Sequence, residues 1–155
     1  MTQRIAVVSG GIGGLGTAIC ERLAASGHRV IATDLAAREE RIAAFLVEHS
    51  GRDVHFEPAD VADFAQCATL IQRIEEQHGP VDVLVNAAGI TRDVTLRKMD
   101  ETQWQDVLRV NLDGVFNLCR QVVDGMCTRG FGRIVNISSV NGQTGQLGQS
   151  NYAAA

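Results

Sequence analysis

The stretch "RIAVVSGGIGGLG" (residues 4–16) decides how this chain folds. It opens with a short apolar run, typical of a strand that is buried on both faces of a parallel sheet. The run stops at Gly10. From Gly14 the apolar residues recur at steps of three and four, which predicts an amphipathic helix that ends near Gly27. We therefore expect a strand, a glycine-rich turn and a helix in that order.

The same alternation continues along the chain. Apolar runs predict further strands at residues 28–34, 54–60, 81–89 and 133–139. Helices are predicted between them up to about residue 50, over 63–78 with Asp63 as its cap, and over 100–130 with Asp100 at its start. A Gly- and Gln-rich loop follows, and Tyr152 lies at what reads as the start of a last helix. Because parallel neighbours need right-handed crossovers, the pattern predicts a single α/β domain over residues 1–155, a doubly wound parallel sheet of order 3-2-1-4-5.

Composition excludes several classes of function. The 155 residues are 45% hydrophobic and 21% charged, with a net charge of -4, so neither a nucleic acid nor a membrane partner is expected. The first residues, "MTQRIAVVSGG", show no basic leader or cleavage site. The four cysteines form no CxxC pair, and the four histidines lack the spacing of zinc ligands. We expect a cytoplasmic protein with reduced thiols and no metal.

The glycine-rich turn is suited to a phosphate. A phosphate placed there would meet free backbone N–H groups and the positive end of a helix dipole. The glycines can be parsed as GxGxxG or, as we prefer, as GxxxGxG beginning at Gly10. No lysine follows, which disfavours a nucleoside triphosphate loop, and the strand–turn–helix context favours a dinucleotide over a turn without a ligand. The expected cofactor-binding residues in the turn are Gly10, Gly11, Ile12, Gly13, Gly14, Leu15 and Gly16.

Asp34 bears on the choice of cofactor. It ends the second predicted strand, 18 residues after Gly16. A carboxylate there can accept hydrogen bonds from both hydroxyls of an adenosine ribose, and it would repel a 2'-phosphate. We therefore expect NAD(H) to be preferred over NADP(H). Two alternatives remain: Arg38 could bind that phosphate, and Asp34 could instead cap the next helix.

Four motifs together resemble the short-chain dehydrogenase/reductase family. They are "SGGIGGLG", "NAAG" (residues 86–89), "RVNLDG" with Asn111, and "NISS" followed by Tyr152. The resemblance covers the whole chain and about the first three-fifths of such an enzyme. Two positions depart from the family pattern: Ser9 replaces a threonine, and Ala87 replaces the second asparagine of NNAG.

The resemblance assigns roles to individual residues. Tyr152 would give a proton to the substrate oxygen as hydride leaves the nicotinamide, and Ser139 would orient the substrate. Asn111 would kink or hydrate its helix and help hold a proton-relay water, unless it merely caps a helix irregularity. The resemblance also implies that the cofactor contacts Asp60 and Val61 at the adenine edge, and Asn86, Ala88, Gly89 and Tyr152 elsewhere.

The resemblance also implies that the chain is a fragment. A free tyrosine has a pKa of about 10, and a nearby cation would lower it toward neutral pH. The family places a lysine four residues after the tyrosine, one helical turn away. That position would be 156, whereas the sequence ends at Ala155. We expect the sequence to stop just before this lysine, with later strands of the sheet missing.

The loops give hints about the substrate. "GITRDVTLRKM" and "SSVNGQTGQLGQSNY" are similar to acetoacetyl-CoA reductases of polyhydroxybutyrate synthesis and to 3-oxoacyl-carrier-protein reductases. This implies NAD(P)H-dependent reduction of a 3-oxoacyl thioester to the 3-hydroxy form by a homotetramer, with acetoacetyl-CoA favoured and a thioester on a carrier protein as the alternative. A nucleotide-binding module without turnover is the alternative, and the Gln-rich loop could be solvated surface. The residues that would bind substrate are Asp93, Lys98, Ser139, Gln146, Leu147 and Gln149.

Overall fold

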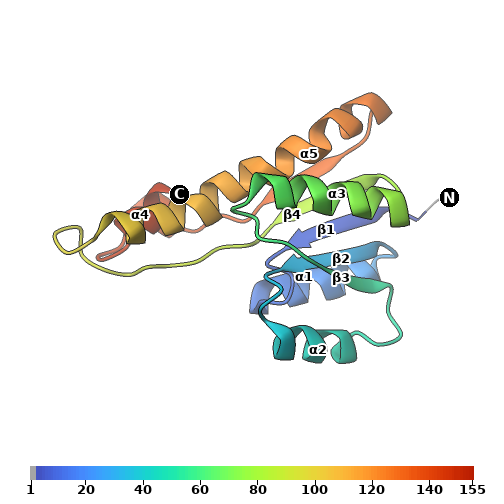
Figure 1. Cartoon of the computed structure of the whole chain (residues 1–155), viewed down its shortest axis with the longest axis horizontal. Helices are drawn as coiled ribbons and strands as arrows, with labels where there is room; N and C mark the ends of the chain where they lie inside the picture. The colour runs from blue at the N-terminus through green and yellow to red at the C-terminus, as the bar shows by residue number, and fades with distance from the viewer. Residues whose placement is uncertain (1–2) are drawn as a thin grey trace.

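The fold, seen in a computed structural model that describes residues 3–155, is built on one five-stranded sheet (Figure 1). All neighbouring strands are parallel, and their order is β3-β2-β1-β4-β5, which confirms the predicted topology. The order reverses between β1 and β4, and this is where such sheets bind ligands. The strands are β1 (Ile5–Ser9), β2 (Arg29–Asp34), β3 (Val54–Pro58), β4 (Val81–Asn86) and β5 (Arg133–Asn136).

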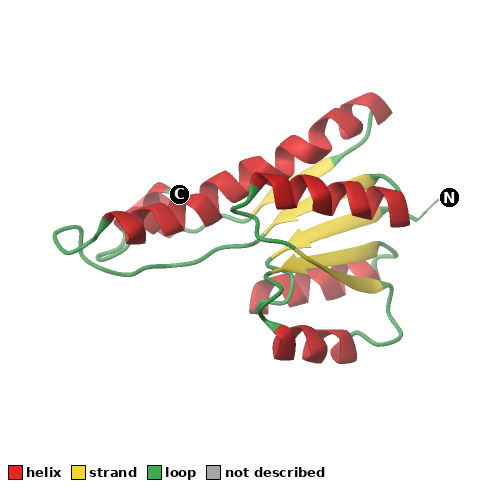
Figure 2. Cartoon of the chain, viewed as in Figure 1, coloured by secondary structure: helices red, strands yellow, loops and turns green. Residues whose placement is uncertain are grey.

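The helices cover both faces of the sheet. Figure 2 shows α1 and α2 on one face and α3 and α5 on the other. In Figure 1, α4 continues the line of α5 past the end of the sheet, and the C-terminus lies beside it. The helical segments are α1 (Gly14–Ala25), α2 (Glu39–Glu48), α3 (Phe64–His78), α4 (Glu101–Leu108), the π-helix η1 (Arg109–Asp113), α5 (Gly114–Arg129), α6 (Asn141–Thr144) and α7 (Ser150–Ala154).

Burial on both faces explains the apolar runs of the strands. Along β1, Ile5 and Val7 contribute to the core cluster that contains α3 and α5 residues, while Ala6 and Val8 contribute to the cluster that contains α1 and α2 residues. Alternate side chains of a strand point to opposite faces, so every position of β1 has to be apolar or small. The strand consequently shows no polar alternation in its sequence.

Three predicted strands run too far. β3 ends at Pro58, β4 at Asn86 and β5 at Asn136, so the residues predicted to continue them lie in loops. After β4 the cause is visible. The Ser9 hydroxyl accepts the backbone N–H groups of Ala87 and Ala88 at 3.1 and 3.2 Å, which takes them out of the strand pairing. Residues 87–89 thereby become a loop beside the glycine turn.

The predicted helix over residues 100–130 has the expected ends but an irregular middle. Asp100 begins α4 in a capping box with Gln103, and Gly130 ends α5 in the left-handed conformation at φ 64°. Between them, the π-helix η1 contains Asn111. Asp63 caps α3 by accepting the N–H groups of Ala65 and Gln66, as predicted. The short helix α6 lies where only a loop was expected.

Candidate cofactor and catalytic site

Two adjoining cavities open at the carboxyl ends of the strands. One, of about 450 Å³, lies between the glycine turn and the ends of β2 and β3. The other, of about 730 Å³, lies between the end of β5, the π-helix η1 and α7. Leu15 and the loop residues 87–90 line both cavities. A ligand in the first cavity can therefore extend directly into the second.

Three glycines of the turn are required by the fold. Gly10 has φ +63°, and a Cβ there would lie 2.8 Å from the Ala87 carbonyl oxygen. A Cβ on Gly11 would lie 2.6 Å from the Ala32 Cβ, and one on Gly16 would overlap the Gly10 carbonyl oxygen. These positions bring the turn, β2 and the loop after β4 into direct backbone contact.

Gly14 is different, because the fold gives no reason for a glycine there. A Cβ on Gly14 would meet nothing within 4 Å, although Gly14 begins α1 and lines the 450 Å³ cavity. The N–H groups of Gly14, Leu15 and Gly16 have no acceptor within the helix, because they belong to its first turn. Open space beside free donors and the positive end of α1 fits a dinucleotide pyrophosphate.

Not all of the turn faces the cavity. The expected contacts Gly10, Gly13, Gly14, Leu15 and Gly16 line it, whereas Gly11 and Ile12 do not. The Ile12 side chain is only 1% exposed and belongs to the core between the sheet and α1. Any contact that Ile12 makes with a cofactor has to come from its backbone.

The end of β2 presents a nearly buried carboxylate. The Asp34 side chain is 10% exposed; its Oδ1 accepts the Leu35 N–H at 2.8 Å, and its Oδ2 accepts Arg38 Nη1 at 3.1 Å. Helix α2 begins only at Glu39, with Arg38 as its cap residue, so the alternative that Asp34 caps this helix is wrong. Asp34 and Arg38 both line the 450 Å³ cavity.

Asp60 and Val61 line the same cavity from the end of β3. The Asp60 carboxylate is already engaged, because its Oδ1 accepts the Ala62 N–H at 2.9 Å. Beneath them, Cys67 donates its thiol to the Val61 carbonyl oxygen at 3.5 Å. Burial, and then the charges of Asp60 and Asp63, raise the pKa of Cys67 to about 11, so at neutral pH this thiol is an uncharged donor that supports the loop.

Asn111 clamps the loop after β4 to the π-helix. Its Oδ1 accepts the Ile90 N–H at 2.8 Å, and its Nδ2 donates to the Ile90 carbonyl oxygen at 3.0 Å. A Cβ on Gly89 would lie 3.6 Å from Asn111 Oδ1. Asn111 thus lies in the π-helical segment, but its amide binds the loop after β4 and does not cap a helix end.

Ser139 and Tyr152 line the 730 Å³ cavity together with Asn111. Ser139 follows β5, and its Oγ accepts the Asn141 N–H at 3.2 Å. This contact uses an oxygen lone pair and leaves the hydroxyl proton free to donate to a substrate. Tyr152 is carried by α7.

Sequence reasoning missed the neighbour that holds this tyrosine in place. Asn151 is fully buried; its Nδ2 donates to the carbonyl oxygens of Arg92 and Gln103 at 3.2 and 2.9 Å, and its Oδ1 accepts the Tyr152 N–H at 2.8 Å. Its partners are backbone carbonyls 59 and 48 residues away, which no local pattern reveals. Asn151 fixes α7 against α4 and the preceding loop.

Asn86 also has partners that its motif does not suggest. Its Nδ2 donates to Asn136 Oδ1 at 2.9 Å and to Cys119 Sγ at 3.4 Å. The side chain links β4 to β5 and α5, and it lines the 730 Å³ cavity rather than the one at the glycine turn. Ala88 and Gly89 line both cavities.

The structure brings some of the substrate candidates together and separates others. Gln149 Nε2 donates to Asp93 Oδ2 at 2.9 Å, and Gln149 Oε1 accepts Asn141 Nδ2 at 2.7 Å, so these side chains bind one another. Lys98 and Gln146 are exposed, and Leu147 is 91% exposed. Of the six candidates, Ser139 lines the 730 Å³ cavity, and the other five line neither cavity.

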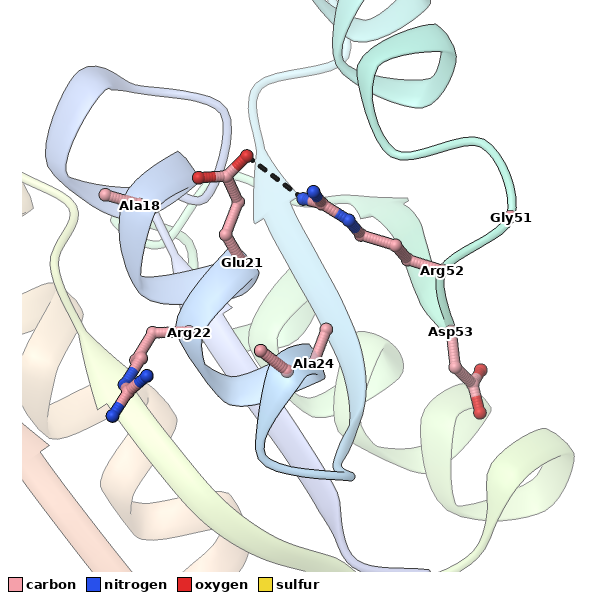
Figure 3. Close-up of a pocket in the computed structure, with 8 residues that line it drawn as sticks. Ala18, Glu21, Arg22, Ala24, Gly51, Arg52 and Asp53 are labelled. Atoms are coloured by element: carbon pink, nitrogen blue, oxygen red, sulfur yellow. Dashed lines mark hydrogen bonds and ion pairs between the residues drawn. The ribbon is translucent and has the colours of Figure 1, made fainter.

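A third pocket lies at the opposite end of the sheet (Figure 3). It is a surface hollow between α1 and the turn before β3, lined by Ala18, Arg22 and the ion pair of Glu21 Oε1 with Arg52 Nη1 at 3.0 Å. Exposed ion pairs of this kind are ordinary surface features. Among residues 3–155, no group of three or more His, Cys, Asp or Glu side chains could hold a metal ion. None of the helices in the described part of the chain is long and apolar enough to cross a membrane.

Comparison with known proteins identifies short-chain dehydrogenases and reductases as similar to this chain. A family model described as short chain dehydrogenase matches residues 4–155. Acetoacetyl-CoA reductase from Allochromatium vinosum is 55% identical over 98% of this chain, and the enzyme of that name from Cupriavidus necator is 50% identical over 100%. A 3-oxoacyl-[acyl-carrier-protein] reductase from Haemophilus influenzae is 40% identical over 100% of the chain. The chain spans 63% of the length of each of these relatives.

A solved structure agrees with the fold. A gluconate 5-dehydrogenase from Burkholderia cenocepacia, in complex with NADP and tartrate, superimposes with a TM-score of 0.87 at 34% identity. The match covers 99% of this chain and 60% of that protein.

Proposed function

This chain belongs to the short-chain dehydrogenase family, and from that premise we propose that the whole protein reduces a 3-oxoacyl thioester with a nicotinamide dinucleotide. The favoured substrate is acetoacetyl-CoA, as in polyhydroxybutyrate synthesis, because relatives 55% and 50% identical carry the name acetoacetyl-CoA reductase. A thioester on a carrier protein is the alternative, in keeping with the relative that is 40% identical. One observation carries the proposal: Asn111, Ser139 and Tyr152 line a cavity that adjoins the glycine turn.

The roles follow from the hydrogen bonds of each side chain. A bound nicotinamide would supply the hydride. Ser139 accepts the Asn141 N–H and can therefore donate its own proton to the substrate carbonyl oxygen. Tyr152 would protonate that oxygen as general acid. Each amide atom of Asn111 bonds Ile90 once and keeps one further hydrogen-bonding position, where a relay water would bind.

We propose NAD(H) as the preferred cofactor over NADP(H). The Asp34 carboxylate lines the cavity at the end of β2, where it can accept ribose hydroxyls and would repel a 2'-phosphate. The Arg38 guanidinium now binds Asp34 Oδ2 at 3.1 Å, so a ribose hydroxyl has to share or replace this contact. Half-exposed Arg38 is also the group through which NADPH would be accepted.

We also propose that the whole protein is a cytoplasmic homotetramer. Leu112 and Phe116 lie exposed on the π-helix and α5, and the Phe116 ring stacks on Phe64 with centroids 6.3 Å apart. A paired aromatic surface on a long helix is suited to burial against another subunit. Sedimentation of the whole protein measures its subunit number, and a monomer at all concentrations would contradict this part.

The test is an assay of the natural full-length protein with acetoacetyl-CoA and with acetoacetyl-carrier protein, each with NADH and with NADPH. Tyr152→Phe and Ser139→Ala are expected to lower kcat by about 10²-fold or more, because each removes a proton donor at the reacting oxygen. Both variants should still bind the cofactor, because the glycine turn and Asp34 are unchanged and Tyr152→Phe keeps the aromatic ring. Arg52→Ala is a control at the opposite end of the sheet.

The possible outcomes separate two classes of function. Loss of turnover in both variants, with intact cofactor binding, supports the reductase. A Tyr152→Phe variant with full activity would overturn it. Cofactor binding by the full-length protein without turnover of either thioester would instead favour a nucleotide-binding module.

A further inference from the structure

Arg41 reaches from α2 to the back of the glycine turn. Its Nε donates to the Ile12 carbonyl oxygen at 2.8 Å, and its Nη2 donates to Thr17 Oγ1 at 3.1 Å. Its Nη1 pairs with Glu48 Oε2 at 3.2 Å on the same helix. Arg41 does not line the cofactor cavity, so it acts on the turn from the side that a cofactor does not touch.

These contacts fix one peptide plane at both ends. The Ile12–Gly13 peptide has its carbonyl oxygen bound by Arg41, and its N–H donates to the Gly10 carbonyl oxygen at 3.0 Å. Gly13 is the cap residue of α1, so this plane sets where the helix begins and where the free N–H groups of Gly14 and Leu15 point. Because glycine has wide backbone freedom, a turn of this composition would otherwise sample many conformations.

Thr17 links Arg41 to a second carbonyl group of the turn. Its hydroxyl accepts from Arg41 and donates to the Gly11 carbonyl oxygen at 3.4 Å. The carbonyl oxygens of Gly11 and Ile12 are both bound on the side of the turn that faces α1 and α2. A carbonyl oxygen turned into the cavity would repel a phosphate, so binding these two favours an anion at the N–H groups.

We propose that Arg41 is a positioning residue that holds the glycine turn in the conformation that receives the dinucleotide pyrophosphate. The inference rests on the proposed function only in that the turn binds a nicotinamide dinucleotide. Arg41 touches neither cofactor nor substrate. Its effect is to reduce the ordering that the turn would otherwise undergo on binding.

The experiment is a titration of the natural full-length protein with NADH and NADPH, combined with steady-state kinetics. Arg41→Ala is expected to raise the Kd and KM for the cofactor about tenfold, on the scale of one charge-assisted hydrogen bond. The kcat at saturating cofactor should change by less than about twofold. Arg41→Lys should restore only part of the affinity, because an ammonium group keeps the charge but cannot donate in the fork geometry of a guanidinium.

Two further variants sharpen the result. Arg52→Ala removes an exposed arginine and an ion pair of similar kind from the pocket in Figure 3, and it should leave the cofactor Kd unchanged. Thr17→Val should weaken cofactor binding in the wild-type background. In the Arg41→Ala background it should weaken binding by less than it does in the wild type, because the Arg41–Thr17 hydrogen bond is already absent there.

The outcomes distinguish this inference from the proposed function. A wild-type protein that binds neither NADH nor NADPH overturns both. A wild-type protein that binds, with an Arg41→Ala variant that binds equally tightly, overturns the role of Arg41 alone. An equal loss of affinity in Arg52→Ala, or a loss confined to kcat, also overturns it.

Discussion

A methyl group on Gly14 and one on Gly16 are expected to have opposite effects. Gly14→Ala meets no atom of the protein, so it should leave stability unchanged or raise it by up to about 1 kcal/mol, the usual gain of Gly→Ala in a helix. It should still weaken dinucleotide binding, because the methyl group occupies the space beside the free N–H groups. Gly16→Ala forces a Cβ against the Gly10 carbonyl oxygen and should destabilise the fold itself.

Urea unfolding and NADH titration of both variants measure the two effects separately. A Gly14→Ala variant that binds the cofactor as well as the wild type would show that the open space is not used by the phosphates. A Gly16→Ala variant of normal stability would show that the turn relaxes around the added methyl group.

At the scale of single residues, sequence motifs indicated which candidate residues would lie near one another better than they indicated the hydrogen bonds of each. Asn111, Ser139 and Tyr152 could be picked out from their motifs, and in the structure all three line the 730 Å³ cavity. What Asn86 binds could not be predicted, because its amide partners, Asn136 and Cys119, lie 50 and 33 residues away. The sequence alone presents Arg41 as an ordinary surface charge, because its partners Ile12 and Thr17 lie 29 and 24 residues away.

At the scale of elements, the N-terminus of α4 is held by a reciprocal pair of hydrogen bonds. The Asp100 side chain accepts the Gln103 N–H at 2.8 Å, and the Gln103 side chain accepts the Asp100 N–H at 3.0 Å. Asp100→Ala should lower the free energy of unfolding by about 1 kcal/mol. Because the Gln103 carbonyl oxygen also binds Asn151, fraying of this turn should loosen the segment that carries Tyr152.

Urea unfolding gives the stability change, and hydrogen exchange of α4 and α7 amides gives its location. Asp100→Asn is the matched control, because asparagine also caps helices well and should retain most of the stability. An Asp100→Ala variant with unchanged exchange in both helices would contradict the proposed link.

Strands and helices were predictable where a single requirement, either burial on both faces or capping of a helix, determines the residue types. Burial on both faces produces the apolar runs of β1 and β4, and good caps mark the starts of α3 and α4. The predicted strands β4 and β5 extended too far, because the last residues of each run lie in a loop. The π-helix η1 was foreseen only as an irregularity around Asn111, since its backbone pattern depends on the tertiary contact with Ile90.

At the scale of the whole molecule, β5 is an edge strand with apolar side chains in solvent. Ile134, Val135 and Ile137 are between 38 and 46% exposed, and β5 pairs only with β4 in the described sheet. Exposed apolar edges favour pairing with another chain. The 155-residue chain is therefore expected to self-associate as its concentration rises, and Val135→Lys should reduce this association.

Light scattering over a range of concentrations measures the association. Val47→Lys is the matched control, because Val47 is 73% exposed on α2 and lies away from the edge. An equal effect of the two substitutions would point to general surface hydrophobicity, and a monomer at every concentration would contradict the expectation outright.

The five-residue π-helix also bears on which changes of length this fold can accept. A π turn holds one residue more than an α turn. Five residues of a π turn span nearly the same rotation and rise as four residues of an α turn, so deleting one residue from 109–113 is expected to give a regular helix whose second half keeps its phase. Leu118 and Val122 would then stay in the core, whereas the wide turn that presents the Asn111 amide to Ile90 would be lost. This stretch should therefore accept shortening by one residue without unfolding α5, at the expense of the hydrogen bonds that join the loop after β4 to the helix.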